Sequence, residues 1–213
     1  MFPGMTTTGP DAPSRTTIQA LRADAAHCQA CPLWQRATQT VFGAGSTRAG
    51  MFLVGEQPGD EEDRQGAPFV GPAGTLLAKA LAAAAIDRRQ CYLTNAVKHF
   101  KWKPTERGKR RLHQKPNALE IAACRPWLLG EIAALRPRVI VCLGATAAQS
   151  LLGSGFRVTK QRGAPIPFGS DARVIATVHP ASILRAPDHQ TRQLEMDRFV
   201  ADLGAARALL SRR

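Results

Sequence analysis

The sequence predicts a three-layer α/β/α domain, in which a central four-stranded parallel sheet lies between two layers of helices. Two observations lead to this prediction. Four short apolar runs alternate along the chain with segments of helical pattern, as in proteins built on a parallel sheet. The runs are apolar throughout, which is typical of strands that helices cover on both faces. We therefore expect an α/β fold with the sheet fully buried.

Helix caps, prolines and glycines delimit the elements. A short helix begins at Thr16 or Thr17 and ends before Pro32. The apolar run 51–54 is the first strand, which passes at Gly55 into a long loop rich in glycine and acidic residues. This loop is longer than a simple connection requires.

The middle of the chain continues the alternation. Alanine-rich sequence after Pro72 predicts a helix, and residues 91–97 form the second strand. Asn117 and Glu120 have the spacing of a capping box, which predicts that a helix begins there. Pro126 should bend or divide that helix.

Two more strands complete the sheet. Residues 138–143 form the third strand, and a helix follows between Gly144 and Gly153. Residues 173–178 form the fourth strand. A last amphipathic helix runs from about Asp188 to about residue 210.

The length and composition fit one domain. The chain has 213 residues, of which 44% are hydrophobic, and this is enough to bury a full core. Residues 1–15 are rich in Thr, Pro, Gly and Ser and are expected to form a disordered leader that contains two candidate starts, Met1 and Met5. Residues 16–213 are expected to form the single domain.

The chain is strongly basic. Its 29 Lys and Arg residues against 16 Asp and Glu residues give a formal net charge of +13, which attracts polyanions such as nucleic acid or an acidic membrane surface. No apolar run approaches the roughly 18 residues of a spanning helix. The first residues also lack the apolar core of a signal peptide. We expect a cytoplasmic protein without a membrane partner, and a monomer.

Polar residues stand at the carboxyl ends of several predicted strands. Glu56 and Gln57 follow the first strand, Asn95 lies in the second, and His179 follows the fourth. Parallel strands bring these ends to one edge of the sheet, where ligands bind. Asn95 could read the edge of a pyrimidine, His179 could donate to a leaving group, and Phe69 in the long loop could stack on a base. Each residue also has a purely structural alternative. Glu56 and Gln57 could form a turn after the strand, Asn95 a cap, His179 a structural hydrogen bond and Phe69 an anchor for the loop.

The segment 101–117 is the most basic part of the chain. It contains seven Lys or Arg residues and one acid, Glu106, and this excess of positive charge suggests contact with a nucleic-acid backbone. His113 follows directly after Lys109, Arg110, Arg111 and Leu112. By charge alone, this histidine cannot be distinguished from an ordinary surface residue.

The five cysteines argue for thiols or a metal site. An odd number without an export signal argues against a disulfide framework, and Cys28 and Cys31 form a Cys-x-x-Cys pair typical of metal ligands. Cys124 and His99 are the best placed further ligands, because Cys91 and Cys142 fall within buried strands. His27 is a further candidate. Zinc and an iron–sulfur cluster both suit such a ligand set.

Several motifs, in matching order, resemble the uracil-DNA glycosylase superfamily. The similarity runs from about Cys28 to Arg185 and is to the iron–sulfur family 4 enzymes and, more closely, to the UdgX-type branch. That branch is distinguished by the segment Lys109-Arg110-Arg111-Leu112-His113. The other matching motifs are Glu56-Gln57-Pro58-Gly59 with Glu62-Asp63, Pro68-Phe69-Val70-Gly71, Thr94-Asn95-Ala96-Val97-Lys98 and His179-Pro180-Ala181-Ser182.

The resemblance implies the uracil-DNA glycosylase fold and the excision of uracil from DNA, preferably single-stranded. It also implies that His113 then bonds to the abasic sugar, in a single-turnover reaction. Glu56 would orient His113 or accept its proton, and His179 would stabilise the departing base. Gly55, Gln57, Phe69 and Asn95 would form the uracil pocket.

The resemblance also implies contacts outside the pocket. Lys109, Arg110, Arg111 and Arg185 would bind the DNA. A 4Fe–4S cluster would be held by Cys28, Cys31, His99 and Cys124.

Two departures from the family pattern stand out. His99 replaces a cysteine of ordinary family 4 enzymes, and Ala181 occupies a place that serine often takes. The alternatives are an ordinary hydrolytic glycosylase, in which Glu56 activates water, and a non-catalytic, metal-containing nucleic-acid-binding module.

Overall fold

A six-stranded sheet forms the middle layer of the computed structural model, which describes residues 17–105 and 110–211. The strand order is β1-β3-β2-β6-β8-β7, in which the four central strands are parallel and the two edge strands are antiparallel. The predicted α/β fold with four parallel strands is therefore confirmed. The strands are β1 (Ala44–Gly45), β2 (Met51–Gly55), β3 (Cys91–Asn95), β6 (Val139–Leu143), β7 (Pro165–Phe168) and β8 (Ala172–Thr177).

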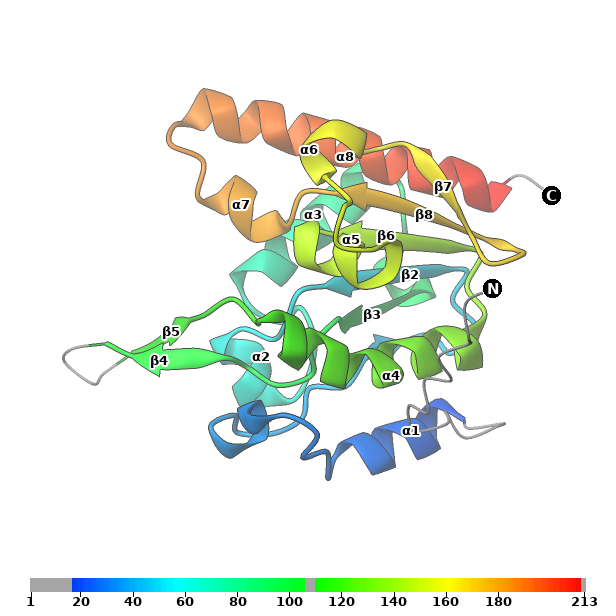
Figure 1. The fold of residues 1–213 in the computed structure, drawn as a ribbon. Helices are drawn as coiled ribbons and strands as arrows, with labels where there is room; N and C mark the ends of the chain where they lie inside the picture. The colour runs from blue at the N-terminus through cyan, green and yellow to red at the C-terminus, as the bar shows by residue number, and fades with distance from the viewer. Residues whose placement is uncertain (1–16, 106–109, 212–213) are drawn as a thin grey trace, which may run out of the picture.

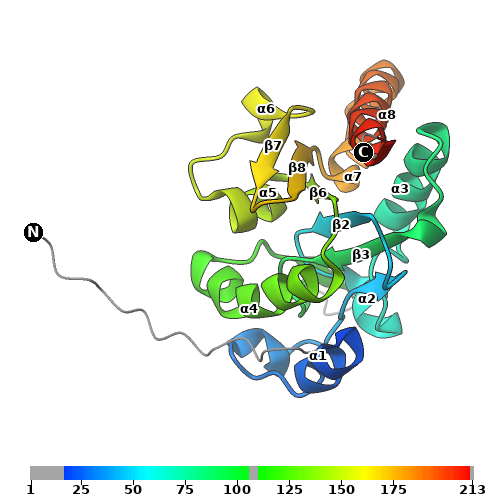
Figure 2. The same ribbon diagram turned by 90° about the vertical axis from the view of Figure 1, so that its right-hand side faces the viewer.

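Helices cover both faces of the sheet, with α3 and α8 on one side and α4 and α5 on the other (Figures 1 and 2). The helix α1 packs outside α4. The helices are α1 (Ile18–Ala25), α2 (Asp60–Gln65), α3 (Pro72–Ala83), α4 (Ala118–Leu135), α5 (Ala145–Leu152), α6 (Val158–Gln161), α7 (Pro180–Leu184) and α8 (His189–Ser211), with short 3-10 turns at Pro32–Gln35 and Arg88–Gln90.

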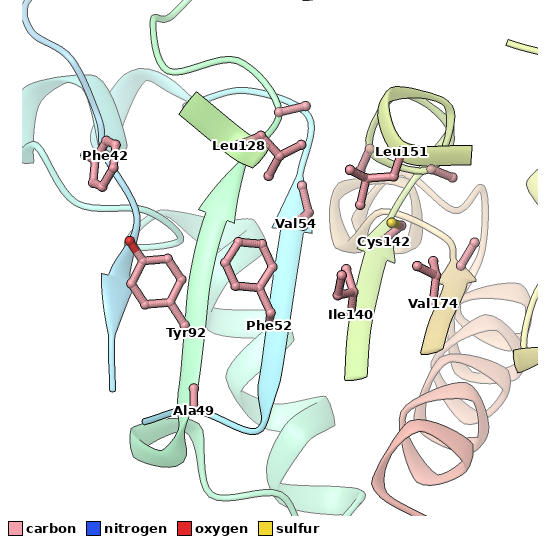
Figure 3. Close-up of a cluster of buried hydrophobic side chains, with 14 of the residues drawn as sticks. Phe42, Ala49, Phe52, Val54, Tyr92, Leu128, Ile140, Cys142, Leu151 and Val174 are labelled. Carbon is pink, nitrogen blue, oxygen red and sulfur yellow. The ribbon is translucent and has the colours of Figure 1, made fainter. Parts of the chain in front are cut away.

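Alternate residues of each central strand pack into two separate cores. Phe52 and Tyr92 stack with ring centroids 5.3 Å apart on the face covered by α4 and α5 (Figure 3). Leu53 and Leu93 point into the other core, against α3 and α8. Because successive side chains of a strand point to opposite faces, uniformly apolar strands require this double cover.

Three elements differ from the sequence-based expectation. The acid-rich stretch after Gly59 forms the helix α2 instead of a loop, since four acidic residues in its first turn favour the positive end of the helix dipole. The helix α4 continues through Pro126 as one element, because Leu128 and Glu131 beyond it are fully buried. The basic segment forms a two-stranded hairpin of β4 (Trp102–Pro104) and β5 (Arg111–His113), separate from the main sheet.

A buried ion pair supports the end of β3. Nζ of Lys98 lies 2.6 Å from the Glu131 carboxylate and also donates to the carbonyl oxygen of Asn95 at 2.8 Å. Both charged side chains are almost completely buried, and the Glu131 carboxylate also accepts hydrogen bonds from Tyr92 and Thr94. A buried charge is tolerated only when it is paired in this way. The network therefore fixes the backbone of Asn95.

Two further expectations concern the start of the chain and the membrane. The predicted disordered leader, residues 1–15, lies outside the described residues. Within the described part of the chain, no helix is both long enough and apolar enough to cross a membrane.

Candidate active site

The carboxyl ends of the four parallel strands open into a cavity of about 650 Å³. Glu56 and Gln57 follow β2, Asn95 ends β3, Thr146 lies just beyond β6 and His179 follows β8. All five residues line this cavity. The structure therefore brings together the polar residues that the sequence places at separate strand ends.

His113 reaches the same cavity from the hairpin of β4 and β5, which extends from this end of the molecule (Figure 1). Its Nε2 atom lies 3.6 Å from Oε1 of Glu56. The other carboxylate oxygen of Glu56 accepts a short hydrogen bond from Oγ1 of Thr146. Thr146 thus orients the carboxylate so that Oε1 faces the imidazole. Thr146 was not singled out from the sequence.

The environment of His113 keeps its ring neutral near pH 7. Its side chain is 49% exposed, and its partial burial lowers the pKa below the ordinary value of a histidine. Glu56 opposes this change and Arg185 reinforces it. A neutral imidazole keeps a lone pair on one ring nitrogen, which is the form that acts as a nucleophile.

Gln57 holds the base of the hairpin that carries His113. Its side-chain nitrogen donates to the carbonyl oxygens of Lys101 at 3.2 Å and Gln114 at 3.0 Å, and its side-chain oxygen accepts from the Lys101 amide. These two residues flank the hairpin on either side. The buried Gln57 amide therefore joins both of its arms to the end of β2.

Arg111, one of the residues expected to bind DNA, lies in a network of ion pairs within the protein. Its guanidinium forms ion pairs with Asp60 and with Asp63, the latter at 2.6 Å, and only 16% of its side chain is exposed. The guanidinium also lies over the rings of Phe100 and Trp102. Its donors are occupied within the protein, so Arg111 fixes the hairpin to α2. The partners lie about 50 residues away in the sequence, so the local charge pattern does not reveal them.

His179 is a neutral hydrogen-bond donor in this site. Its Nδ1 atom accepts a hydrogen bond from the backbone N–H of Ala181 at 3.2 Å. Since a backbone N–H can only donate, Nδ1 is unprotonated and the proton of the ring lies on Nε2. Burial, Arg185 and His113 together lower the pKa of His179 to about 4. The ring can therefore offer one N–H to a group in the cavity without carrying a charge.

Phe69 and Asn95 line the cavity, and Gly55 lies next to both of them without lining it. A Cβ atom on Gly55 would overlap Oδ1 of Asn95 and lie 2.7 Å from the Phe69 ring, so only glycine fits there. The Phe69 and His179 rings have centroids 6.3 Å apart and are tilted by 30°. Asn95 is buried and presents an amide, which can both donate and accept, at the rim of β3.

Glu62 is a pocket residue that sequence reasoning left without a role. Its carboxylate accepts from the backbone N–H of Gly59 at 3.1 Å and of Gly71 at 2.9 Å. It therefore ties together the two glycine turns on either side of α2. The available signal was the spacing of a glycine followed three residues later by a glutamate, which is typical of a helix start.

The remaining predicted DNA contacts lie at or beyond the rim. Arg185 lines the cavity directly after α7, and Arg110 is exposed at the start of β5. Lys109 lies outside the described residues. Lys115 also lines the cavity, although it was not singled out in advance. Lys115 and Arg185 thus place two exposed positive charges at the cavity, of the kind that contact a polyanion, beside the acidic residues Glu56 and Glu61.

The predicted metal ligands lie near one another on the α4 side of the sheet. Sγ of Cys28 accepts from the Trp127 indole at 3.2 Å, and Sγ of Cys124 accepts from the Lys98 amide at 3.1 Å. Burial, with smaller contributions from Cys28 and Cys31, raises the pKa of Cys124 to about 12. N–H donors aimed at sulfur are common around thiolate ligands.

His99 completes the candidate set from the end of β3. It lines a hollow of about 230 Å³ together with Cys28, and its Nε2 atom shares a hydrogen bond with Oγ1 of Thr40 at 2.9 Å. Among residues 17–105 and 110–211, no three His, Cys, Asp or Glu side chains converge as ligands of one metal ion.

The fold and the cavity define a class of protein that holds a planar, polar ring at the carboxyl edge of a parallel sheet. Phe69 offers a stacking face, Asn95 an amide edge and His179 a neutral N–H donor. This arrangement suits a nucleobase. The exposed basic residues at the opening suit the strand that carries it.

Comparison with known proteins agrees with this description. Residues 42–204 match the family profile of the uracil DNA glycosylase superfamily. A type-4 uracil-DNA glycosylase of Thermotoga maritima is 39% identical over 171 residues, which cover 80% of this chain and 84% of the relative. The enzyme of the same name from Pyrobaculum aerophilum is 34% identical, with 80% and 86% coverage. The chain belongs to the uracil-DNA glycosylase superfamily.

Proposed function

We propose that this protein excises uracil from DNA and then becomes covalently attached to the abasic sugar through His113. Membership of the uracil-DNA glycosylase superfamily supports the excision step. The single observation that carries the attachment step is the position of the neutral His113 ring, 3.6 Å from Glu56 and in the same cavity as Asn95 and His179.

Three residues account for recognition and departure of the base. Phe69 stacks on the flipped uracil, and the Asn95 amide pairs with its polar edge. As the glycosidic bond breaks, its electron pair passes to the uracil ring. The Nε2 proton of His179 then stabilises the resulting anion by a hydrogen bond. A neutral donor is favourable here, because a protonated His179 would be a desolvated cation close to Arg185 and His113.

His113 captures the sugar that remains. Loss of the base leaves an oxocarbenium-like carbon, and the unprotonated ring nitrogen of His113 donates its lone pair to form a new C–N bond. The imidazole then carries a positive charge, which Glu56 stabilises or relieves by accepting the remaining ring proton. A well-oriented group competes with water at an effective concentration of ~10⁵ M or more.

One gel experiment separates the proposed reaction from its two alternatives. The protein is mixed with uracil-containing single-stranded DNA, and the products are run under denaturing conditions. A band shift that survives heat and detergent supports trapping. Alkali-labile DNA without a shift would mean hydrolysis with Glu56 activating water, and unchanged DNA would mean simple binding. The same assay with matched duplex DNA tests the proposed preference for single strands.

The proportion of trapped DNA should depend on pH. Because the pKa of His113 lies below that of an ordinary histidine, its ring should be neutral and reactive at neutral pH and should stay so to a lower pH than an ordinary histidine. As the pH falls through the pKa of His113, protonation removes the lone pair and the adduct should decline in favour of hydrolysis. Quantifying adduct and free abasic DNA at each pH measures this ratio. A ratio that rises on acidification would contradict the assignment.

The same proposal includes a 4Fe–4S cluster held by Cys28, Cys31, His99 and Cys124. The proximity of the three thiols and of His99 supports this ligand set. When bound, the cluster would cross-link the segment after α1 to α4 and to the segment that follows β3. It would thereby stabilise the end of β3 that carries Asn95. A histidine ligand raises the potential of such a cluster relative to four cysteines.

Purified protein should therefore be brown and contain iron and sulfide. Replacing Cys124 with alanine should remove the visible absorbance, because a ligand is lost. Cys142→Ala is the matched control. Cys142 is also buried but packs in the main hydrophobic core and is not a proposed ligand, so this substitution should leave the colour unchanged. A colourless wild-type protein that contains zinc would show that the cluster assignment is wrong.

A further inference from the structure

The backbone of Phe69 is held in an unusual conformation. Its φ angle is 56°, in the left-handed region that non-glycine residues rarely adopt. Such a conformation persists only where surrounding groups enforce it, and it is concentrated at functional sites. Two neighbours of Phe69 enforce it here, and neither was singled out from the sequence.

The first neighbour is Gly74 in the opening turn of α3. A Cβ atom at this position would overlap the carbonyl oxygen of Phe69 and lie 2.8 Å from its Cα atom. The helix therefore packs directly against the Phe69 backbone. Only glycine allows this approach, since any side chain would displace the loop.

The second neighbour is Arg88, in the 3-10 turn before β3. Its Nη2 atom donates to the carbonyl oxygen of Phe69 at 2.9 Å, and Nη1 donates to that of Gly74 at 3.3 Å. One guanidinium thus bridges the two backbone segments that meet at Phe69. Such a bridge needs the fixed fork of donors that arginine provides.

In the described part of the chain, no other structural or functional role is evident for the Arg88 side chain. It is half-buried, forms no ion pair with a described Asp or Glu, and is not among the residues that line the cavity. Its neighbour Arg89 is 90% exposed and pairs with Asp87. A partly desolvated charge whose donors go to the carbonyls of Phe69 and Gly74 indicates that Arg88 holds this loop against the start of α3.

We infer that Arg88 is a positioning residue that fixes the Phe69 ring in place for stacking before DNA arrives. The inference rests on the proposed stacking role of Phe69. The edge of the ring lies close to Gly55, where an added Cβ atom would be 2.7 Å away, so the position of the Phe69 backbone decides where the ring meets the base. Arg88 acts on the reaction only through Phe69.

A double-mutant cycle tests this inference. Arg88→Met, Phe69→Ala and the double variant are compared in single-turnover excision from uracil-containing DNA, with substrate affinity and maximal rate measured separately. Since complete loss of stacking corresponds to roughly 5- to 150-fold, we expect about tenfold from Arg88→Met, mainly in affinity. In the Phe69→Ala background, Arg88→Met should have almost no further effect.

Controls make every outcome decisive. Arg89→Met should match the wild type, because Arg89 contacts only Asp87 among the described residues. Arg88→Gln, whose amide is too short to bridge both carbonyls, replaces Arg88→Met if that variant does not fold. Equal losses from the Arg88 change with and without Phe69, or no loss at all, would overturn the inference. A wild-type protein that leaves uracil in DNA would instead refute the proposed function.

Discussion

Replacement of His113 by alanine should abolish the heat- and detergent-resistant adduct while uracil excision continues. The residues that hold and release the base, Phe69, Asn95 and His179, remain in the cavity of the variant. Water then captures the sugar, so the product becomes free abasic DNA. Because a positioned imidazole outcompetes water by an effective concentration of ~10⁵ M or more, we expect the adduct to fall below detection.

Two measurements establish whether the loss reflects the nucleophile. Denaturing gels quantify the adduct and the alkali-labile DNA in parallel, and mass spectrometry of the digested wild-type adduct identifies the modified peptide. Leu112→Ala is the matched control, because Leu112 lies on the same strand but is 43% exposed on its opposite face. An adduct that persists in the His113→Ala protein would rule out this histidine as the attachment point.

Replacement of His179 by alanine should slow the excision step itself. The Nε2 proton of His179 is the donor proposed for the departing uracil anion, and loss of one such donor costs about 10²- to 10³-fold in rate. Adduct and abasic product should therefore decline together, unlike in the His113→Ala protein. Single-turnover release of uracil measures the effect directly, with the exposed His189→Ala as the histidine control.

The pH dependence of excision provides a second test of His179. Its pKa of about 4 lies below the ordinary value, so the neutral, donating ring is present at neutral pH and is lost only on acidification towards that value. Excision should therefore stay level while trapping at His113 already declines. A fall in excision that parallels the fall in trapping would contradict this assignment, because it would mean that the group needed for excision titrates together with His113 and well above a pKa of about 4.

Local patterns in the sequence are sufficient to define the four parallel strands and much of the cavity wall, but not the antiparallel edge strands β1 and β7. Uniformly apolar runs define the four parallel strands, and the residues just after them, such as Glu56 and His179, must meet at one edge. The Asn117–Glu120 capping box occurs where the spacing predicts it. These features depend on neighbours a few residues apart, so the sequence shows them directly.

Contacts between distant segments decide the rest. The resemblance implied a DNA contact for Arg111, and only folding shows that Asp60 and Asp63 form ion pairs with its guanidinium. Family resemblance pointed to His113 as the reactive histidine, but only packing shows how its hairpin is fixed beside Glu56.

The same holds for the strained loop at Phe69. Nothing near it in the sequence indicates that Gly74 and Arg88 enforce its conformation. The charge and hydrophobicity of a side chain show which kinds of contact it can make. Which partner it meets depends on how the layers pack.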